Sequence, residues 1–407
     1  MNAKIRSIKK RDDIYSVILQ ALNNIASGKE SDLLLFNIWG THGSGKTYML
    51  DLIKDQVQSL DNVKILGPID LSKKDHDLLD KTLNDTKKAS RLTPKIVLLD
   101  NLKSVVREGQ EDMFIYDVEE RLIGPVLSTG DTVIVVTSLH EIKQWRSVEV
   151  RARHRTILIP PFALKMFKEA VKAGKLNYGV TLKKTMGHPK LLEWLIENPS
   201  WDMEELDGKA LEYFLNGLEP ATRRVAQAVS LSFSFNVPAY QTIVKSAKLD
   251  GNSSYFSDLK KIKELGSIGL ITYESTTGMY HFSDRVLRGV LARSFMREFP
   301  NLAAEIYNAL AELAERESMF DNSLSSHFLN LLYYQAWKAK LHAFPFREWL
   351  DQWFHDREDV NWQDVNRQIM SNPSSKYILA EIKKIADPEI YKTIELKLHS
   401  SGEKNEK

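Results

Sequence analysis

The stretch Leu33–Leu50, LLLFNIWGTHGSGKTYML, decides the fold. It opens with apolar residues of the kind that fill a central parallel strand. From Gly40 to Thr47 it then matches the pattern G-x-x-x-x-G-K-[ST] of a phosphate-binding loop. From Tyr48 onward, apolar residues recur at helical spacing. The order strand, glycine-rich loop and helix predicts an α/β nucleotide-binding domain.

The chemistry of the loop explains its composition. Glycines let consecutive backbone N–H groups turn toward an anion, at the positive end of the following helix. We expect Lys46 to reach the β- and γ-phosphates of ATP or ADP, and the Thr47 hydroxyl to ligate Mg²⁺. The alternative is a glycine turn that holds no ligand. The further residues expected to bind nucleotide here are Gly40, Thr41, His42, Gly43, Ser44, Gly45 and Tyr48.

The composition narrows the class of protein. A chain of 407 residues allows about two to four domains. The apolar fraction of 43% is that of an ordinary globular protein, and the net charge of +2 gives no reason to expect a polyanionic partner. Cysteine is absent, which excludes disulfides and thiolate chemistry. Without an apolar run of membrane-spanning length or a signal-peptide core, the sequence predicts a soluble cytoplasmic protein that does not contact membranes.

Four further runs predict strands, so that we expect a five-stranded parallel sheet with right-handed crossovers. Asp100 follows an apolar run, at the edge of the sheet where open α/β folds bind ligands, and is expected to hold Mg²⁺ through water as a Walker-B acid does. Thr137 and Ser138 end the next run, where they would sense a γ-phosphate. The four runs are Val63–Ile69, Lys95–Asp100, Thr132–Val136 and Arg155–Ile159.

Two local features have competing interpretations. The arginines at 146, 151, 153 and 155 are most simply a solvated face. The alternative is that Arg151 or Arg153 meets the charge that develops on a phosphate, within one chain or across a subunit contact. Further on, Gly187-His188-Pro189 reads most simply as punctuation between two helices.

Together these residues resemble the STAND class of P-loop NTPases, the AAA+ relatives that include the NB-ARC and archaeal-ATPase families. The resemblance implies that Arg11 lies near the nucleotide, that Thr137 and Ser138 form the first sensor, and that Pro189 packs on the adenine from a helical lid. It covers about the first half of the chain and, more loosely, a winged-helix region after it. The matching pieces are Arg11-Asp12, Gly40–Thr47, Leu98–Leu102, Val135–Ser138 and Gly187-His188-Pro189.

The chain departs from that family at two positions. Relatives commonly carry a second acid directly after the Walker-B aspartate, where Asn101 stands here. Since an amide cannot accept a proton, the sequence predicts slow or weak ATP hydrolysis and leaves open whether the protein is an enzyme. Many relatives also place an arginine at the position of Leu139.

The second half is expected to be mainly helical. Three helices and a hairpin with strands at 269–273 and 279–282 have the layout of a winged helix, whose third helix carries Lys260, Lys261 and Lys263. His281 and Asp284 are either a nucleotide contact or a strand histidine with a helix cap. The expected domains are 1–161 (nucleotide-binding), 162–205 (helical lid), 206–295 (winged helix), 296–398 (helical) and 399–407 (disordered tail).

The leading hypothesis is an ATP-binding molecular switch, in which nucleotide state changes how the lid and the winged helix pack. Its output would be a protein partner or self-assembly into a homo-oligomer. One alternative is a DNA-binding, initiator-like or transcription-regulating AAA+ ATPase acting through the winged helix, which the interleaved acids disfavour. A second alternative is a scaffold whose nucleotide is structural.

Overall fold

The computed structural model describes residues 11–60, 62–90, 93–102, 113–142, 145–159, 164–216, 218–249, 254–274, 278–318, 324–342, 344–358 and 360–399. The predicted disordered tail begins at residue 399, but His399 is the last residue of α20, and residues 400–407 lie outside the described residues. The chain forms two compact units. Unit 1 comprises residues 1–214 and 263–270, and unit 2 comprises residues 215–262 and 271–407. The finer domain boundaries given above stay a prediction.

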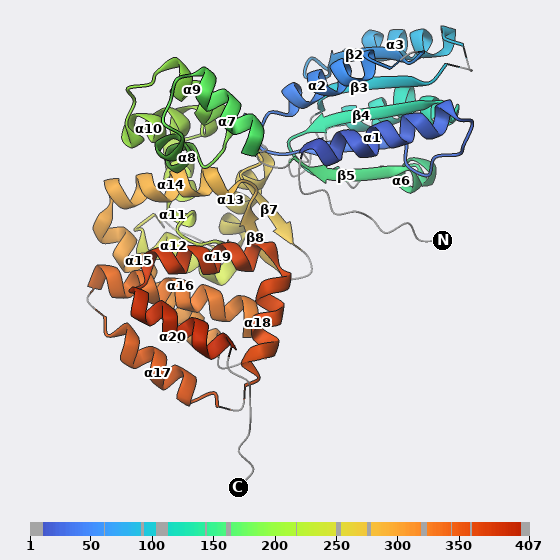
Figure 1. The fold of residues 1–407 in the computed structure, drawn as a ribbon. Coiled ribbons are helices and arrows are strands. Elements are labelled where there is room, and N and C mark those ends of the chain that lie inside the picture. Colours follow the sequence, from blue (N-terminus) through green and yellow to red (C-terminus); the bar gives the residue numbers. More distant parts are fainter. Residues whose placement is uncertain are drawn as a thin grey trace. The chain divides into compact units, whose positions relative to one another are not determined.

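Unit 1 is built on a five-stranded sheet in the order β2-β3-β4-β1-β5, in which every neighbouring pair is parallel (Figure 1). The predicted α/β class and the five predicted strands are therefore confirmed. Because all strands run the same way, their carboxyl ends share one edge of the sheet. The strands are β1 (Leu35–Trp39), β2 (Lys64–Asp70), β3 (Lys95–Leu102), β4 (Thr132–Ser138) and β5 (His154–Leu158).

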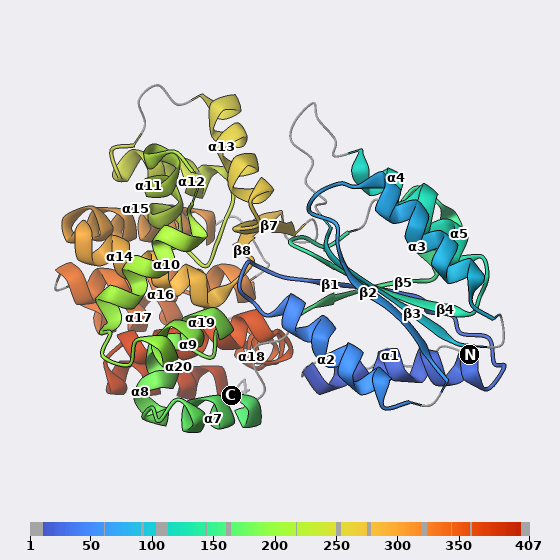
Figure 2. The ribbon, with the colours of Figure 1, turned by 90° about the horizontal axis from the view of Figure 1, so that it is seen from above.

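Helices cover both faces of this sheet, which is why the central strands are mostly apolar. Every residue of β4 is buried, and β1 is buried except for its last residue. The helices α1 (Arg11–Ala26) and α2 (Lys46–Gln58) lie on one face (Figure 2). The opposite face carries α3 (His76–Lys88), α4 (Phe114–Val118) and α5 (Gly124–Leu127), and α6 (Val148–Ala152) precedes β5.

A π-helical turn, η1 (Glu119–Ile123), lies between α4 and α5. Glu119 is 4% exposed in this turn, and its carboxylate accepts hydrogen bonds from the backbone N–H groups of Arg146 at 2.9 Å and Ser147 at 2.7 Å. The buried charge is thus satisfied by backbone donors from the loop before α6. Helical periodicity alone could not predict this irregular turn.

Four helices follow the sheet in unit 1: α7 (Leu164–Ala173), α8 (Tyr178–Thr185), α9 (Pro189–Glu197) and α10 (Met203–Phe214). The sequence predicts this helical segment. Asn177 caps α8, because its side chain accepts a hydrogen bond from the Val180 N–H. Pro189 occupies the first position of α9, where its missing N–H has no helical partner to lose.

Unit 2 begins with α11 (Pro220–Val229), β6 (Ser234–Phe235), α12 (Val237–Ser246), α13 (Tyr255–Ser267), β7 (Ile271–Glu274) and β8 (Met279–Phe282). The last residues of α13, from Lys263, group with unit 1. The three strands form an antiparallel sheet in the order β6-β8-β7. Asp284 caps α14 (Arg285–Glu298) because its side chain accepts hydrogen bonds from the N–H groups of Val286 and Leu287. On β8, His281 Nε2 lies 3.1 Å from Glu274 Oε2. These positions match the alternative of a strand histidine and a helix cap.

Six helices complete unit 2, and aromatic residues fill the space between them. Phe328 stacks on Trp353 at 5.0 Å between ring centroids, and Trp362 lies at 5.2 Å from the same ring. These side chains are buried, as expected for a packing core. Across the described part of the chain, no helix is long and apolar enough to cross a bilayer. The helices are α15 (Pro300–Ser318), α16 (Leu324–His342), α17 (Phe346–His355), α18 (Trp362–Ser371), α19 (Pro373–Ile385) and α20 (Pro388–His399).

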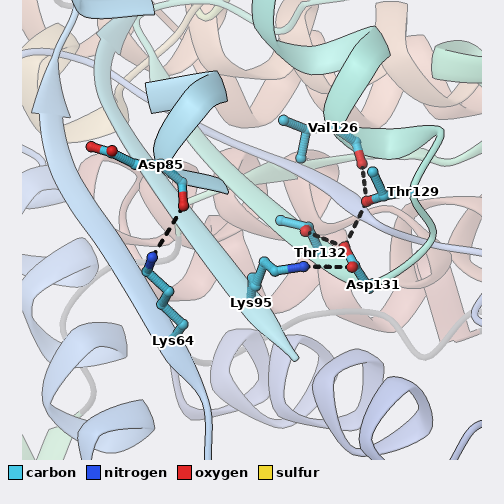
Figure 3. A network of polar contacts seen from close by, with 7 residues as sticks. All are labelled: Lys64, Asp85, Lys95, Val126, Thr129, Asp131 and Thr132. Atoms are coloured by element: carbon cyan, nitrogen blue, oxygen red, sulfur yellow. Dashed lines mark hydrogen bonds and ion pairs between the residues drawn. The ribbon is translucent and has the colours of Figure 1, made fainter. Parts of the chain in front are cut away.

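A buried ion pair joins β3 to the start of β4, at the amino-terminal edge of the sheet (Figure 3). Lys95 is 2% exposed, and its Nζ donates to Asp131 Oδ2 at 2.5 Å. The hydroxyls of Thr129 and Thr132 approach Asp131 Oδ1 at 2.6 and 2.7 Å. Burial raises the pKa of Asp131, but Lys95 and the two hydroxyls outweigh that effect and hold it below its ordinary value. The sequence analysis did not anticipate this pair.

We predict that Lys95→Met lowers the free energy of unfolding by about 3–5 kcal/mol, because it leaves the Asp131 carboxylate buried without its partner. Urea denaturation followed by circular dichroism measures the change. The double variant Lys95→Met/Asp131→Asn removes both charges and should recover much of the loss. Equal stability of wild type and Lys95→Met would contradict the assignment of this pair as a structural one.

Candidate phosphate-binding site

The predicted phosphate loop connects the end of β1 to the start of α2. Gly43 and Gly45 have φ angles of 71° and 85°, a region that residues with a side chain seldom adopt. Gly40 is restricted by space instead, since a Cβ atom there would lie 2.6 Å from Cγ2 of Ile159. A side chain would therefore be unfavourable at each of these three positions, and the three glycines together allow the tight turn into the helix.

Lys46 begins α2 and is 8% exposed. Its Nζ donates to the carbonyl oxygens of Gly40 at 2.6 Å and Thr41 at 2.8 Å. Burial lowers the pKa of Lys46 to about 8, and the charge of Asp100 opposes that shift. In the described part of the chain no carboxylate pairs with this ammonium, which is the arrangement expected where an anion is to bind.

The candidate Mg²⁺ ligands come together at the carboxyl edge of the sheet. Thr47 Oγ1 donates to Asp100 Oδ2 at 2.8 Å, and Asp100 is 5% exposed. Thr137, at the end of β4, donates its hydroxyl to the other Asp100 oxygen. One hydroxyl and one carboxylate are hard oxygen donors of the kind Mg²⁺ accepts alongside water and phosphate. The residues at this point therefore fit the metal.

The two predicted sensor residues do different things. Thr137 contacts Asp100, whereas Ser138 donates to the His140 carbonyl and accepts from Asn37 Nδ2 at 2.7 Å. Asn37 lies on β1 with no exposed surface, and its Oδ1 accepts from the Ile142 N–H at 3.0 Å. Ser138 and Asn37 thus hold the loop after β4 against β1. The only feature of the sequence that could have indicated this role is that Asn37 is a polar residue inside an apolar strand, and it was not predicted.

A cavity of about 680 Å³ opens over the loop, lined on one side by loop residues and on the other by α9 and α10. Pro189 is among its lining residues, and its packing on the adenine stays a prediction. Gly43 packs against the start of α9, since a Cβ there would lie 2.8 Å from the Lys190 Cβ. Gly187-His188-Pro189 thus precedes a helix whose start packs against the phosphate loop. Tyr48 also lines the cavity, and Tyr213 on α10 is a lining residue that the sequence analysis missed.

Other predicted site residues lie elsewhere. Arg151 is exposed on α6, and Arg153 donates to the Leu127 carbonyl at 3.0 Å and pairs with Glu149. Both precede β5, whose first residue aligns with the first residue of β1, so the length of β1, about 13 Å, separates them from the loop. Within one chain the structure does not bring either arginine to Lys46. The side chain of Arg11 lies outside the described residues.

Asn101 lines the same cavity. Its φ angle is 59°, and its Nδ2 donates to Asp70 Oδ1, at the end of β2, over 3.2 Å. Asp70 also accepts from the N–H and hydroxyl of Ser72. The backbone N–H of Ser72 is the largest of the influences that hold the Asp70 pKa below its ordinary value. Asn101, which departs from the family pattern, is thus hydrogen-bonded to the carboxylate of Asp70, a residue that the sequence motifs did not indicate.

The strand order and the glycine-rich loop between β1 and α2 define an α/β fold of the P-loop type. No family model and no curated protein matches the chain. Among solved structures, the chain is similar to the ORC2 protein of Aeropyrum pernix, at 12% identity over 74% of this chain and 96% of that one, with a TM-score of 0.38. It is also similar to Cdc6p of Pyrobaculum aerophilum, at 11% identity over 73% of this chain and 97% of that one, with a TM-score of 0.35. The AMPPCP-bound DnaA of Aquifex aeolicus is 13% identical over 73% of this chain and 100% of its own, with a TM-score of 0.32.

The depressed pKa of Lys46 predicts that nucleotide affinity depends on pH. The protonated ammonium is the form that binds phosphate, so above pH 8 binding must first return a proton to Lys46. We expect the Kd for ADP to be about 30-fold higher at pH 9.5 than at pH 7, from the ratio of neutral to charged lysine. Isothermal titration calorimetry measures the affinity and, in buffers of different ionisation enthalpy, the proton uptake. Lys46→Arg stays charged over this range, so identical pH profiles for the two proteins would show that Lys46 does not titrate.

Proposed function

We propose that the protein is an ATP-binding molecular switch that hydrolyses ATP slowly, with the nucleotide held between the phosphate loop and helices α9 and α10. One observation carries the proposal. Lys46 is a buried ammonium whose recorded partners are two loop carbonyls, beside a cavity large enough for a nucleotide. Nucleotide phosphates would supply a negatively charged hydrogen-bond partner for this ammonium.

The contacts of the site suggest a role for each residue. Lys46 would hold the β- and γ-phosphates, while Thr47 and Asp100 would hold Mg²⁺, which supplies positive charge to offset that of the phosphates. Thr137 contacts Asp100 directly, so a change around Asp100 on loss of the γ-phosphate would reach β4 through this hydroxyl. Pro189 and Tyr213 lie on the lid side of the cavity, where they would contact the base.

The tight contact between Gly43 and Lys190 supports a switch rather than a passive binding site. Because the loop leaves no room for a Cβ at Gly43, a displacement of the loop would press on the start of α9. The lid would then respond to which nucleotide fills the loop. We assign the output to a protein partner or to self-assembly, as STAND proteins are expected to act.

Nucleotide content is the direct test. We expect purified wild-type protein to bind ADP with micromolar or tighter affinity and Lys46→Ala to bind at least 100-fold more weakly, because the buried positive charge is lost. Calorimetry on both proteins measures this. Lys29→Ala, at an exposed lysine before β1, is the matched control and should bind as wild type does. Wild type without affinity for ADP or ATP would refute the proposed function.

A second candidate function is DNA binding through α13, taken as the recognition helix of a winged helix. The order α11, β6, α12, α13 and the β7–β8 hairpin supports that motif. Asp258, which seemed to interrupt the lysines, is buried and bonded to Gln241. The exposed surface of α13 carries Lys260, Lys263 and the acid Glu264. Tyr255 and Phe256, near its start, are 54% and 81% exposed.

This candidate predicts salt-dependent DNA binding. Lys260→Ala/Lys263→Ala should weaken binding to a duplex at least fivefold in 50 mM salt, as phosphate contacts are lost. Fluorescence anisotropy measures it, with Lys392→Ala/Lys397→Ala on α20 as a control of equal charge. Absence of binding by wild type at low salt would eliminate the DNA-binding candidate and leave the nucleotide switch intact.

A further inference from the structure

A pair of polar residues at the edge of the site bears on hydrolysis. Asn101 sits in a bulge of β3, where Leu99 aligns with Val136 but Leu102 aligns with Ser138, so three steps along β3 oppose two along β4. Its backbone N–H donates to Asp100 Oδ1 and to Thr137 Oγ1, each at 3.0 Å. This bulge fixes the Asn101 backbone next to the candidate Mg²⁺ ligand.

A second bulge, in β2, sets the position of Asp70. Leu66 aligns with Val97, and Ile69 then aligns with Leu99, so β2 gains one residue relative to β3. As a result Asp70 aligns with Asp100 rather than with Asn101. From this position Asp70 accepts the hydrogen bond from Asn101 Nδ2 across the shifted register.

The chemistry of this contact orients the amide. An ionised carboxylate can only accept, so Asn101 must present Nδ2 to Asp70. Its Oδ1, which is an acceptor, is then left on the side away from Asp70. Asn101 lines the cavity over the phosphate loop, and Asp70 is not among the lining residues. The negative charge of Asp70 also polarises the amide, which makes Oδ1 a better acceptor.

We propose that Asn101 Oδ1 positions the water that attacks the γ-phosphate of ATP, and that Asp70 is the positioning residue that holds the amide in this orientation. The inference rests on the proposed function and deepens it. A side-chain amide can orient an attacking water without serving as a base. The pair Asp70–Asn101 thus takes the place of the second acid that the family pattern carries after Asp100.

The step balances without a protein base. The water oxygen forms a bond to the γ-phosphorus as the bond from that phosphorus to the bridging oxygen breaks, and the electron pair of the broken bond stays on ADP. Both protons of the water leave on the phosphate, so ATP⁴⁻ and H₂O give ADP³⁻ and H₂PO₄⁻. Asn101 accepts a hydrogen bond and no proton, which accounts for slow turnover.

Single-turnover hydrolysis of ATP and calorimetric affinity for ADP, measured on the full chain, test the pair. Asp70→Asn should lower the hydrolysis rate at least tenfold while the Kd for ADP stays within twofold, because an amide at 70 no longer dictates which way Asn101 faces. Asn101→Ala should lose as much, and Asp70→Asn/Asn101→Ala no more than either single change, because the two residues act as one unit. The reversed pair, Asp70→Asn/Asn101→Asp, should restore turnover to at least the wild-type rate.

Asp77→Asn is the matched control, since Asp77 is an exposed carboxylate on α3 away from the cavity lining. A hydrolysis rate for Asp70→Asn equal to that of Asp77→Asn would overturn the inference, as would additive losses in the double variant. So would a wild-type rate no higher than that of Lys46→Ala. If wild type binds no ADP, the proposed function fails and this inference fails with it, whereas normal ADP binding with an unaffected rate refutes only the inference.

Discussion

The hydrogen bond between Thr47 and Asp100 is the contact on which the site depends. Thr47 follows β1, yet β3 is not the neighbour of β1, because β4 lies between them. The phosphate loop must therefore cross the end of β4 to reach the carboxylate. Thr137, at that end, bonds to the same Asp100 and closes the gap. The start of α2 and the ends of β3 and β4 are thus joined by two hydroxyl hydrogen bonds to one carboxylate.

Two buried lysines, Lys95 and Lys46, lie at opposite edges of the sheet, and their hydrogen-bond partners differ. Lys95 meets the carboxylate of Asp131, which itself is satisfied by threonine hydroxyls, and the network is complete. Lys46 meets carbonyl dipoles instead, and burial lowers its pKa to about 8. A complete network stabilises the fold. An ammonium that donates to carbonyl oxygens, with the charge of Asp100 nearby but no carboxylate bonded to it, retains a preference for an added anion.

Irregular backbone shapes the candidate site. The bulge in β3 with its left-handed Asn101 and the two left-handed glycines of the loop lie at the carboxyl edge of the sheet, and the bulge in β2 lies between Leu66 and Ile69. Bulges redirect side chains that a regular strand would point to the opposite face. Here they place Asp70 and Asn101 side by side next to Asp100, while the buried middle of the sheet stays regular.

The sequence by itself determined the five strands, the phosphate loop and the start of α9 at Pro189. Apolar runs, glycine conformation and proline's fixed φ are properties of a few neighbouring residues, so they can be recognised without knowing the fold. Only the tertiary structure decided which residues meet. The partners Lys95 and Asp131, or Asp70 and Asn101, are more than 30 residues apart in sequence. Their contacts depend on strand order and on a one-residue shift in register, which packing between distant segments sets and no local pattern encodes.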